Sequence, residues 1–177
     1  MNKIILTGPK HSGKTSAGKA LASLFSCDFI DLDDLITKKT GKTPRQLFIE
    51  GQSVFQKAEA EAASTLMTQN RFFIIAAGGG IIDNSEAIAA IKNSGTTMIY
   101  LNISANLAWS RIAAGGELPP FLQTENPQET HRALHERRAA GYVQIADIII
   151  DVDGKSPEQI AQMVLKEYGL DTAKLVM

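Results

Sequence analysis

The sequence contains few residues that could form covalent cross-links or a zinc site. Its 177 residues include a single cysteine, Cys27, so no disulfide can form within the chain. One cysteine also provides neither a CxxC motif nor the Cys/His cluster that is typical of zinc sites. We therefore expect a protein of a reducing compartment, the cytoplasm.

An excess of positive charge is also missing. The chain has 18 basic and 19 acidic residues, and its formal net charge is -1 at pH 7. A protein with this balance has no overall positive field with which to attract nucleic acid or an anionic membrane surface. We therefore expect neither of them as a partner.

Long apolar runs are absent as well. No uninterrupted run reaches the roughly 18 residues that suggest a membrane-spanning helix. The opening residues MNKIILTG lack the apolar segment of a secretory signal. We therefore expect neither export nor membrane insertion. The length fits one globular domain over residues 1–177, which we expect to be a monomer.

Short apolar runs alternate with longer segments of helical period, a pattern typical of a parallel sheet with crossover helices. The fold class expected is therefore α/β, a three-layer α/β/α sandwich around a five-stranded parallel sheet. The predicted strands are residues 4–7, 29–32, 72–76, 97–101 and 148–151. The predicted helices are residues 14–25, 33–40, 53–68, 85–93, 105–114, 127–142 and 157–168. Residues 113–126 combine Gly-Gly with Pro-Pro and are predicted to form a mobile lid loop.

The segment GPKHSGKT, residues 8–15, matches the P-loop pattern GxxxxGK[ST]. It lies between a predicted strand and a predicted helix, which is the setting that the motif requires. In such a loop the backbone N–H groups point at phosphate oxygens, Lys14 reaches the β- and γ-phosphates, and the Thr15 hydroxyl can bind Mg²⁺. His11 is either a tolerated loop residue or a phosphate contact. The predicted nucleotide contacts in and just after the loop are Gly8, Lys10, His11, Ser12, Gly13, Lys14, Thr15 and Ser16.

Three aspartates follow the second predicted strand in the segment FIDLDD, residues 29–34. Asp31 and Asp33 are two positions apart, so an extended chain projects both to one side at the carboxyl end of the sheet. One carboxylate there could hold Mg²⁺ or its waters, and another could orient an attacking hydroxyl toward the γ-phosphate. Asp34 is interpreted as a solvated residue of the first helical turn. The alternative is that all three aspartates only cap the helix.

Together these motifs resemble the shikimate kinase family, within the nucleoside-monophosphate-kinase-like branch of P-loop proteins. The resemblance covers nearly the whole chain and consists of GPKHSGKT, FIDLDDLITKKTG, LFIEGQSVFQKAE, AAGGGIID, MIYLNIS and HERRAAGY. It implies a P-loop kinase that uses ATP and Mg²⁺ to phosphorylate a hydroxyl group of a small cyclic polyol acid. For shikimate itself this would be the 3-hydroxyl, in a step of aromatic amino acid biosynthesis.

The resemblance implies catalytic roles for Lys14, Asp31 and Asp33. Lys14 and Thr15 would serve the ATP phosphates and Mg²⁺, and Asp31 would hold Mg²⁺ through water. Asp33 would bind the substrate hydroxyls. Other roles follow in the same way: Gly78, Gly79 and Gly80 would bring backbone amides against the substrate, Arg138 would pair with the substrate carboxylate, and Arg111 would lie near the adenine.

Two positions depart from the family pattern. Gln56, in the substrate-binding segment, stands where the family has an arginine that grips the substrate carboxylate. The adjacent Lys57 is turned by about 100° on a helix and lacks the planar fork of arginine. In the lid, Pro119 stands where the family has a phosphate-clamping arginine, and residues 112–131 contain no lysine or arginine. The P-loop residue Lys10 is our hypothesis for the missing positive charge.

Arg45 and Arg137 are weaker candidates for the missing charge, because nothing in their spacing selects them over solvent exposure. Three functions remain open at this point. The chain could be a kinase of the shikimate kinase type, a kinase for another small polyol or sugar acid, or a nucleotide-binding module with little turnover. A panel of acceptors separates the first two. Tight ATP binding without phosphoryl transfer would favour the third.

Overall fold

A computed structural model describes residues 3–169 of the chain. Within these residues a single parallel sheet has the strand order β2-β3-β1-β4-β5. The strands are β1 Ile4–Thr7, β2 Asp28–Asp31, β3 Phe73–Ala76, β4 Thr97–Asn102 and β5 Ile148–Asp151. Because β1 lies in the middle of the sheet, the loop that follows it has neighbours on both sides at the carboxyl edge.

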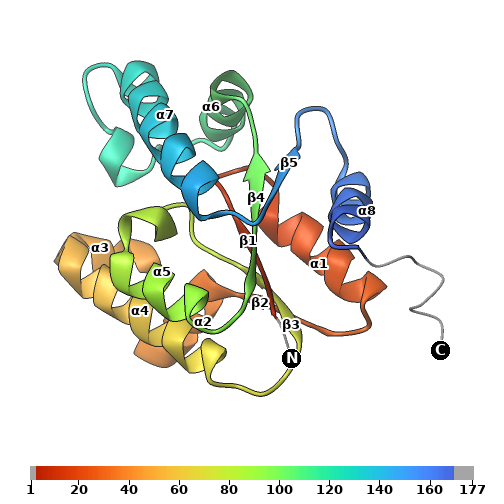
Figure 1. The fold of residues 1–177 in the computed structure, drawn as a ribbon. Helices are drawn as coiled ribbons and strands as arrows, with labels where there is room; N and C mark the ends of the chain where they lie inside the picture. Colours follow the sequence, from red (N-terminus) through yellow and green to blue (C-terminus); the bar gives the residue numbers. More distant parts are fainter. Residues whose placement is uncertain (1–2, 170–177) are drawn as a thin grey trace.

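Helices cover both faces of the sheet (Figure 1). The α-helices are α1 Lys14–Leu24, α2 Leu32–Thr40, α3 Pro44–Glu50, α4 Gln52–Met67, α5 Ser85–Lys92, α6 Ala105–Ala114, α7 Pro127–Ile145 and α8 Pro157–Glu167. Two short 3₁₀ helices, η1 Ile81–Asp83 and η2 Pro120–Leu122, lie between them. Helices α1 and α8 pack together on one face of the sheet, and α4 and α5 pack together on the other.

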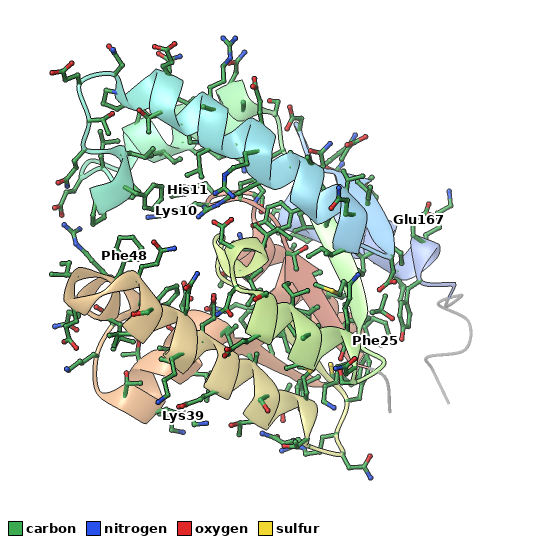
Figure 2. The ribbon with its side chains drawn as sticks, turned by 60° about the vertical axis from the view of Figure 1, so that its left-hand side comes forward. Lys10, His11, Phe25, Lys39, Phe48 and Glu167 are labelled. Carbon is green, nitrogen blue, oxygen red and sulfur yellow. The ribbon has the colours of Figure 1, made fainter. Side chains whose placement is uncertain are left out.

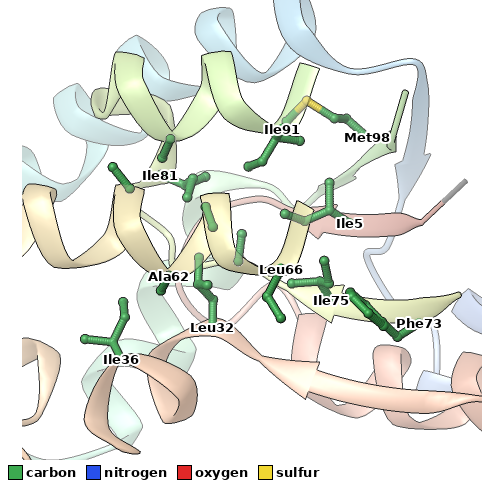
Figure 3. Close-up of a cluster of buried hydrophobic side chains, with 14 of the residues drawn as sticks. Ile5, Leu32, Ile36, Ala62, Leu66, Phe73, Ile75, Ile81, Ile91 and Met98 are labelled. Atoms are coloured by element: carbon green, nitrogen blue, oxygen red, sulfur yellow. The ribbon is translucent and has the colours of Figure 1, made fainter. Parts of the chain in front are cut away.

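Two apolar cores result from the alternation of side chains along the strands. Ile5 and Ile75 face a core that includes residues of α2, α4 and α5, as Figure 3 shows. Ile4 and Leu6 face the other core, which is formed with α1 and α8. Both sets are almost fully buried, because a parallel sheet with helices on both faces has no solvated side. This packing holds the carboxyl edge of the sheet in place.

The structure confirms the expected fold class, and all five strands and seven predicted helices exist with shifts of three residues or fewer at their ends. One helix was missed, α3 Pro44–Glu50. Its start signals were present in the sequence: Thr43 caps it, Gln46 completes a capping box, and Pro44 occupies the first turn. At seven residues it is too short for an apolar period to be recognised.

The helices of residues 3–169 include none that is both long and apolar enough to cross a membrane. The predicted lid, residues 113–126, contains the end of α6, η2 and the connecting loops.

Candidate active site

The P-loop connects β1 to α1 through a tight turn beside β4. Gly8 has a φ of +140°, and a Cβ on it would lie only 2.7 Å from the carbonyl oxygen of Leu101. Glycine is required here because a side chain would collide with fixed backbone. His11 also takes a left-handed conformation, with a φ of +64°. Its carbonyl oxygen accepts a hydrogen bond of 2.8 Å from Nη1 of Arg111, so α6 is fixed to the loop.

Lys14 lies buried inside this loop. Its Nζ donates to the carbonyl oxygens of Gly8, at 2.9 Å, and Pro9, at 2.7 Å. Burial lowers the pKa of Lys14 to about 8, against the opposing effect of the Asp33 and Asp31 carboxylates. A phosphate group placed in the loop would add negative charge beside this ammonium and favour its charged form.

Asp31 connects the P-loop to the start of α2. Its Oδ2 accepts a hydrogen bond of 2.8 Å from the Thr15 hydroxyl, and its Oδ1 accepts one of 3.1 Å from the Asp33 N–H. The prediction that Asp31 and Asp33 share one side of an extended chain was wrong, because α2 begins at Leu32 and Asp31 is its N-cap. Both carboxylates nevertheless lie near Lys14, and both raise its pKa. Asp34 is exposed, as predicted.

Two carboxylates converge on the first glycine of the GGG segment. A Cβ on Gly78 would lie 3.1 Å from Asp33 Oδ1 and 3.3 Å from Glu59 Oε1. Neither oxygen has a hydrogen-bond partner among residues 3–169. Burial raises the pKa of Asp33, and the neighbouring Asp31 raises it further. Unpartnered buried acceptors are costly, so these two oxygens are ready to accept donors from a ligand.

Glu59 on α4 is fully buried, and its Oε2 accepts a hydrogen bond of 2.9 Å from Nδ2 of Asn84. Burial raises the pKa of Glu59 to about 7, and this effect outweighs the hydrogen bond from Asn84. Its carboxyl group therefore changes charge near neutral pH.

The middle glycine packs directly against the P-loop. A Cβ on Gly79 would lie 2.9 Å from the Lys10 nitrogen, so the two loops touch through their backbones. The Gly79 carbonyl oxygen accepts a hydrogen bond of 2.7 Å from the hydroxyl of Tyr142 on α7. Figure 2 shows Lys10 and His11 close to α7, with Phe48 of α3 on the same side of the molecule.

The third glycine lies beside a cluster of charges around Asp83 of η1. Asp83 accepts hydrogen bonds of 2.7 and 3.2 Å from Arg137 and one of 2.9 Å from Nε of Arg138. Nη2 of Arg138 forms an ion pair of 2.7 Å with the same carboxylate. Nη2 of Arg138 lies 3.3 Å from the position that a Cβ on Gly80 would occupy. Gln56 reaches the same segment, because its Nε2 donates to the Asp83 carbonyl oxygen at 3.0 Å.

The lid contacts both sides of this region. Glu117 forms an ion pair of 2.6 Å with Arg45 of α3. The Phe121 ring lies under the Arg138 guanidinium, 5.9 Å from its central carbon. The lid thus contacts Arg138, beside the GGG segment, through the Phe121 ring. It also contacts α3 through the surface ion pair of Glu117 with Arg45, which contributes little to stability.

The structure brings together most of the residues predicted for the site. The P-loop, Asp31, Asp33, the three glycines, Gln56 and Arg138 form one connected region, and Arg111 joins it through His11. Lys10, Thr15 and Ser16 are exposed at its edge. A hollow of about 620 Å³ between α6 and α7, lined by residues such as Trp109 and His131, shares none of these residues.

Sequence reasoning assigned no site role to Glu59, Asp83 or Tyr142. Each stands inside a segment that carries the family resemblance, FQKAE, GGGIID or HERRAAGY. Their positions inside those segments were the only indication in the sequence that they belong to the site. Their partners lie far away along the chain, which is why the sequence alone gave no reason to select them.

Comparisons with known proteins agree with this geometry. The sequence model of the shikimate kinase family matches residues 10–168. A shikimate kinase of Thermodesulfovibrio yellowstonii is 36% identical over 169 residues, 95% of each chain. One from Streptomyces avermitilis is 31% identical over 173 residues, 97% of this chain and 98% of that relative.

Among solved structures, the shikimate kinase from Acinetobacter baumannii in complex with shikimate has a TM-score of 0.86 and 30% identity. The match covers 95% of this chain and 93% of that one. A sugar kinase from Janibacter sp., at 12% identity and a TM-score of 0.66, shares the fold.

Proposed function

The chain belongs to the shikimate kinase family, and on this premise we propose that it transfers the γ-phosphoryl group of ATP to the 3-hydroxyl group of shikimate. It is a phosphotransferase with an alcohol acceptor, and its nucleotide is ATP. The observation that carries the proposed acceptor is the contact between the GGG segment and the P-loop at Gly79 and Lys10. A small molecule held by the glycines would lie next to the end of the phosphate chain.

We assign the nucleotide to the P-loop. The backbone N–H groups of the loop, to which Pro9 contributes none, and the N-terminus of α1 would hold the phosphates. Lys14, buried in the loop, would pair with the β- and γ-phosphates, and charge compensation there is the main task of a phosphoryl-transfer site. Arg111, which is bonded to His11, would lie along the adenine side of the nucleotide.

Mg²⁺ is the expected metal, and the Thr15 hydroxyl and the Asp31 carboxylate fit it. Both groups provide hard oxygen ligands, and the bond of 2.8 Å between them places them at one point beside the phosphate loop. Thr15 would bind the ion and Asp31 would hold it through water. When bound, Mg²⁺ neutralises negative charge on the phosphates.

The acceptor would lie against Asp33 and the glycines. The unpartnered Asp33 Oδ1 would accept a hydrogen bond from a substrate hydroxyl and orient its oxygen toward the γ-phosphate. Backbone amides of Gly78, Gly79 and Gly80 would contact the ring substituents. Arg138, held by Asp83 beside Gly80, would pair with the substrate carboxylate.

The second candidate is a kinase whose acceptor, unlike shikimate, has no carboxylate, and Gln56 is the observation that favours it. This side chain is neutral, and its Nε2 already donates to the Asp83 carbonyl oxygen. A panel of sugar and polyol acceptors tests this alternative.

We also propose that the protein is a cytoplasmic monomer. Size-exclusion chromatography of the native protein would test the oligomeric state.

The decisive experiment measures ADP release with MgATP in the presence and absence of millimolar shikimate. We expect shikimate-dependent release in the wild type and its loss in Asp33→Ala, with ATP binding retained in the variant. ATP binding without any stimulation by shikimate would contradict the proposal. A binding-only protein or another acceptor would then be the better interpretation, and the panel would separate them.

A further inference from the structure

Charges do not balance around Asp83. Arg137 and Arg138, which are adjacent on α7, both donate to its Oδ2, so two guanidinium groups lie side by side at one carboxylate. This carboxylate is largely buried, with 20% of its side chain exposed. The pKa of Asp83 is lowered by the two arginines against the effect of burial, which means that its carboxylate is charged. These three side chains by themselves therefore carry one positive charge in excess, and the nearby Glu59 carboxyl group, which burial keeps partly protonated near pH 7, offsets only part of it.

The excess charge lies beside the proposed acceptor site. Arg138 is mostly buried, with 19% of its side chain exposed, and its Nη2 is close to Gly80. Arg137 is 59% exposed, so its guanidinium can rotate with little displacement of its neighbours. Gln56 approaches Asp83 through the backbone carbonyl and contributes no charge. An anion placed between Gly80 and the two arginines would restore the balance of charge.

The other cations considered for this position fit it less well. Arg45 has its own carboxylate partner, Glu117, in a pair of one cation and one anion. Lys57 is exposed on α4, and an ammonium cannot form the paired N–H bonds that match a carboxylate. Lys10 stands on the P-loop side of the glycines, next to Gly79. Arg137, in contrast, already donates to the same Asp83 oxygen, Oδ2, as Arg138.

We propose that Arg137 is a specificity-determining residue: with Arg138 it binds the carboxylate of the acceptor, and it supplies the second guanidinium that Gln56 does not. This inference rests on the proposed function. Asp83 holds both arginines near the site before the acceptor arrives. The acceptor carboxylate then becomes the second anion, and Arg137 donates to it while Arg138 remains between the two carboxylates.

The test compares shikimate with its methyl ester, which keeps the three hydroxyl groups and loses the negative charge. Steady-state ADP release is measured for the wild type and for Arg137→Gln with both acceptors. We expect the KM for shikimate to rise about tenfold or more in the variant, the scale of a lost charge-assisted hydrogen bond. The kcat for shikimate and the KM for the ester should change little.

Arg132→Gln is the matched control, because Arg132 is on the same helix, 73% exposed, and paired with Glu136 one turn away. It should leave both acceptors unaffected. Arg137→Lys should fall between the wild type and Arg137→Gln. Adding Gln56→Arg to Arg137→Gln should recover most of the loss for shikimate, because position 56 also reaches Asp83 and an arginine there returns a guanidinium. Thermal unfolding of each variant separates these effects from a loss of folded protein.

Two results would overturn the inference. One is an unchanged KM for shikimate in Arg137→Gln, and the other is an equal loss of kcat/KM for shikimate and for the ester, which would indicate a general structural role. A wild type without shikimate-dependent ADP release is a distinct result. It overturns the proposed function itself, and the inference with it, before any variant is compared.

Discussion

Lys14 combines two opposed properties in one residue. Its ammonium is buried, which costs free energy, and its pKa is lowered to about 8 for that reason. The same group faces the loop that would hold the ATP phosphates. A residue kept at such a cost is expected to serve catalysis and not folding.

Lys14→Met should therefore separate activity from stability. We expect kcat to fall by at least about a hundredfold, because a positive charge at the transferred phosphoryl group is lost. The midpoint of thermal unfolding should change little, because removing a buried charge is favourable while the carbonyl oxygens of Gly8 and Pro9 lose their donor. Coupled ADP release and differential scanning fluorimetry measure the two effects. A large drop in thermal midpoint would mean that Lys14 is needed for the fold.

The lid, residues 113–126, contains no lysine or arginine, and Lys10 is the residue that we expect to supply the missing positive charge. Its side chain is exposed, and its backbone touches Gly79 at the junction of the two loops. If its ammonium stabilises the γ-phosphate during transfer, Lys10→Ala should lower kcat about tenfold or more with little change in stability. Lys38→Ala, an exposed lysine on α2, is the control. An unchanged kcat in Lys10→Ala would reject this role.

At the scale of elements, the sequence was most informative where pattern and position coincide. β1 and β5 have the predicted bounds, and the P-loop lies where a strand–loop–helix order requires. The order of Asp31 and Asp33 along the chain correctly predicted that both lie near the P-loop residue Lys14, but the extended conformation predicted for them was wrong. The missing information was local: the Asp31 side chain caps α2 and ends the strand one residue early.

Contacts between distant elements could not be predicted. Asp83 and Arg137 are 54 residues apart, and each alone resembles an ordinary surface charge. The same holds for Tyr142 and Gly79, which are 63 residues apart. Such pairs depend on how α7 crosses the end of the sheet. A single sequence does not show where α7 lies relative to the end of the sheet.

The contact between α7 and the GGG segment yields a prediction for Tyr142. Its hydroxyl fixes the Gly79 carbonyl, and its ring stacks on Tyr100 at 5.0 Å. Tyr142→Phe keeps the stacking and leaves a partly buried carbonyl without its donor, which should cost about 1 kcal/mol of stability. The KM for shikimate should rise several-fold, and the KM for ATP should stay unchanged.

Tyr100→Phe is the matched control, because the Tyr100 hydroxyl donates to Asn102 and not to the glycines. It should lower stability without a selective effect on shikimate. Urea denaturation and steady-state kinetics of both variants provide the comparison. Equal kinetic effects of the two substitutions would show that Tyr142 acts only through packing.

At the scale of the whole molecule, Glu59 links the folding equilibrium to pH. Its carboxyl group is fully buried between α4 and the glycine segment, and its folded-state pKa of about 7 lies above the ordinary value of 4.5. Between these two values the folded protein keeps a proton that the unfolded chain has lost. The contribution of Glu59 to stability is therefore greatest below pH 4.5, decreases as the pH rises, and is constant above about pH 7.

Glu59→Gln should remove this dependence, because the amide has no charge at any pH and can still accept the hydrogen bond from Asn84. Between pH 5 and pH 8 the wild type should lose about 1 to 3 kcal/mol more free energy of unfolding than the variant. Urea denaturation at several pH values measures the difference, with the exposed Glu61→Gln on the same helix as control. Parallel curves for wild type and Glu59→Gln would mean that Glu59 is already ionised in the folded protein at pH 5, in contact with a cation or water that offsets its burial.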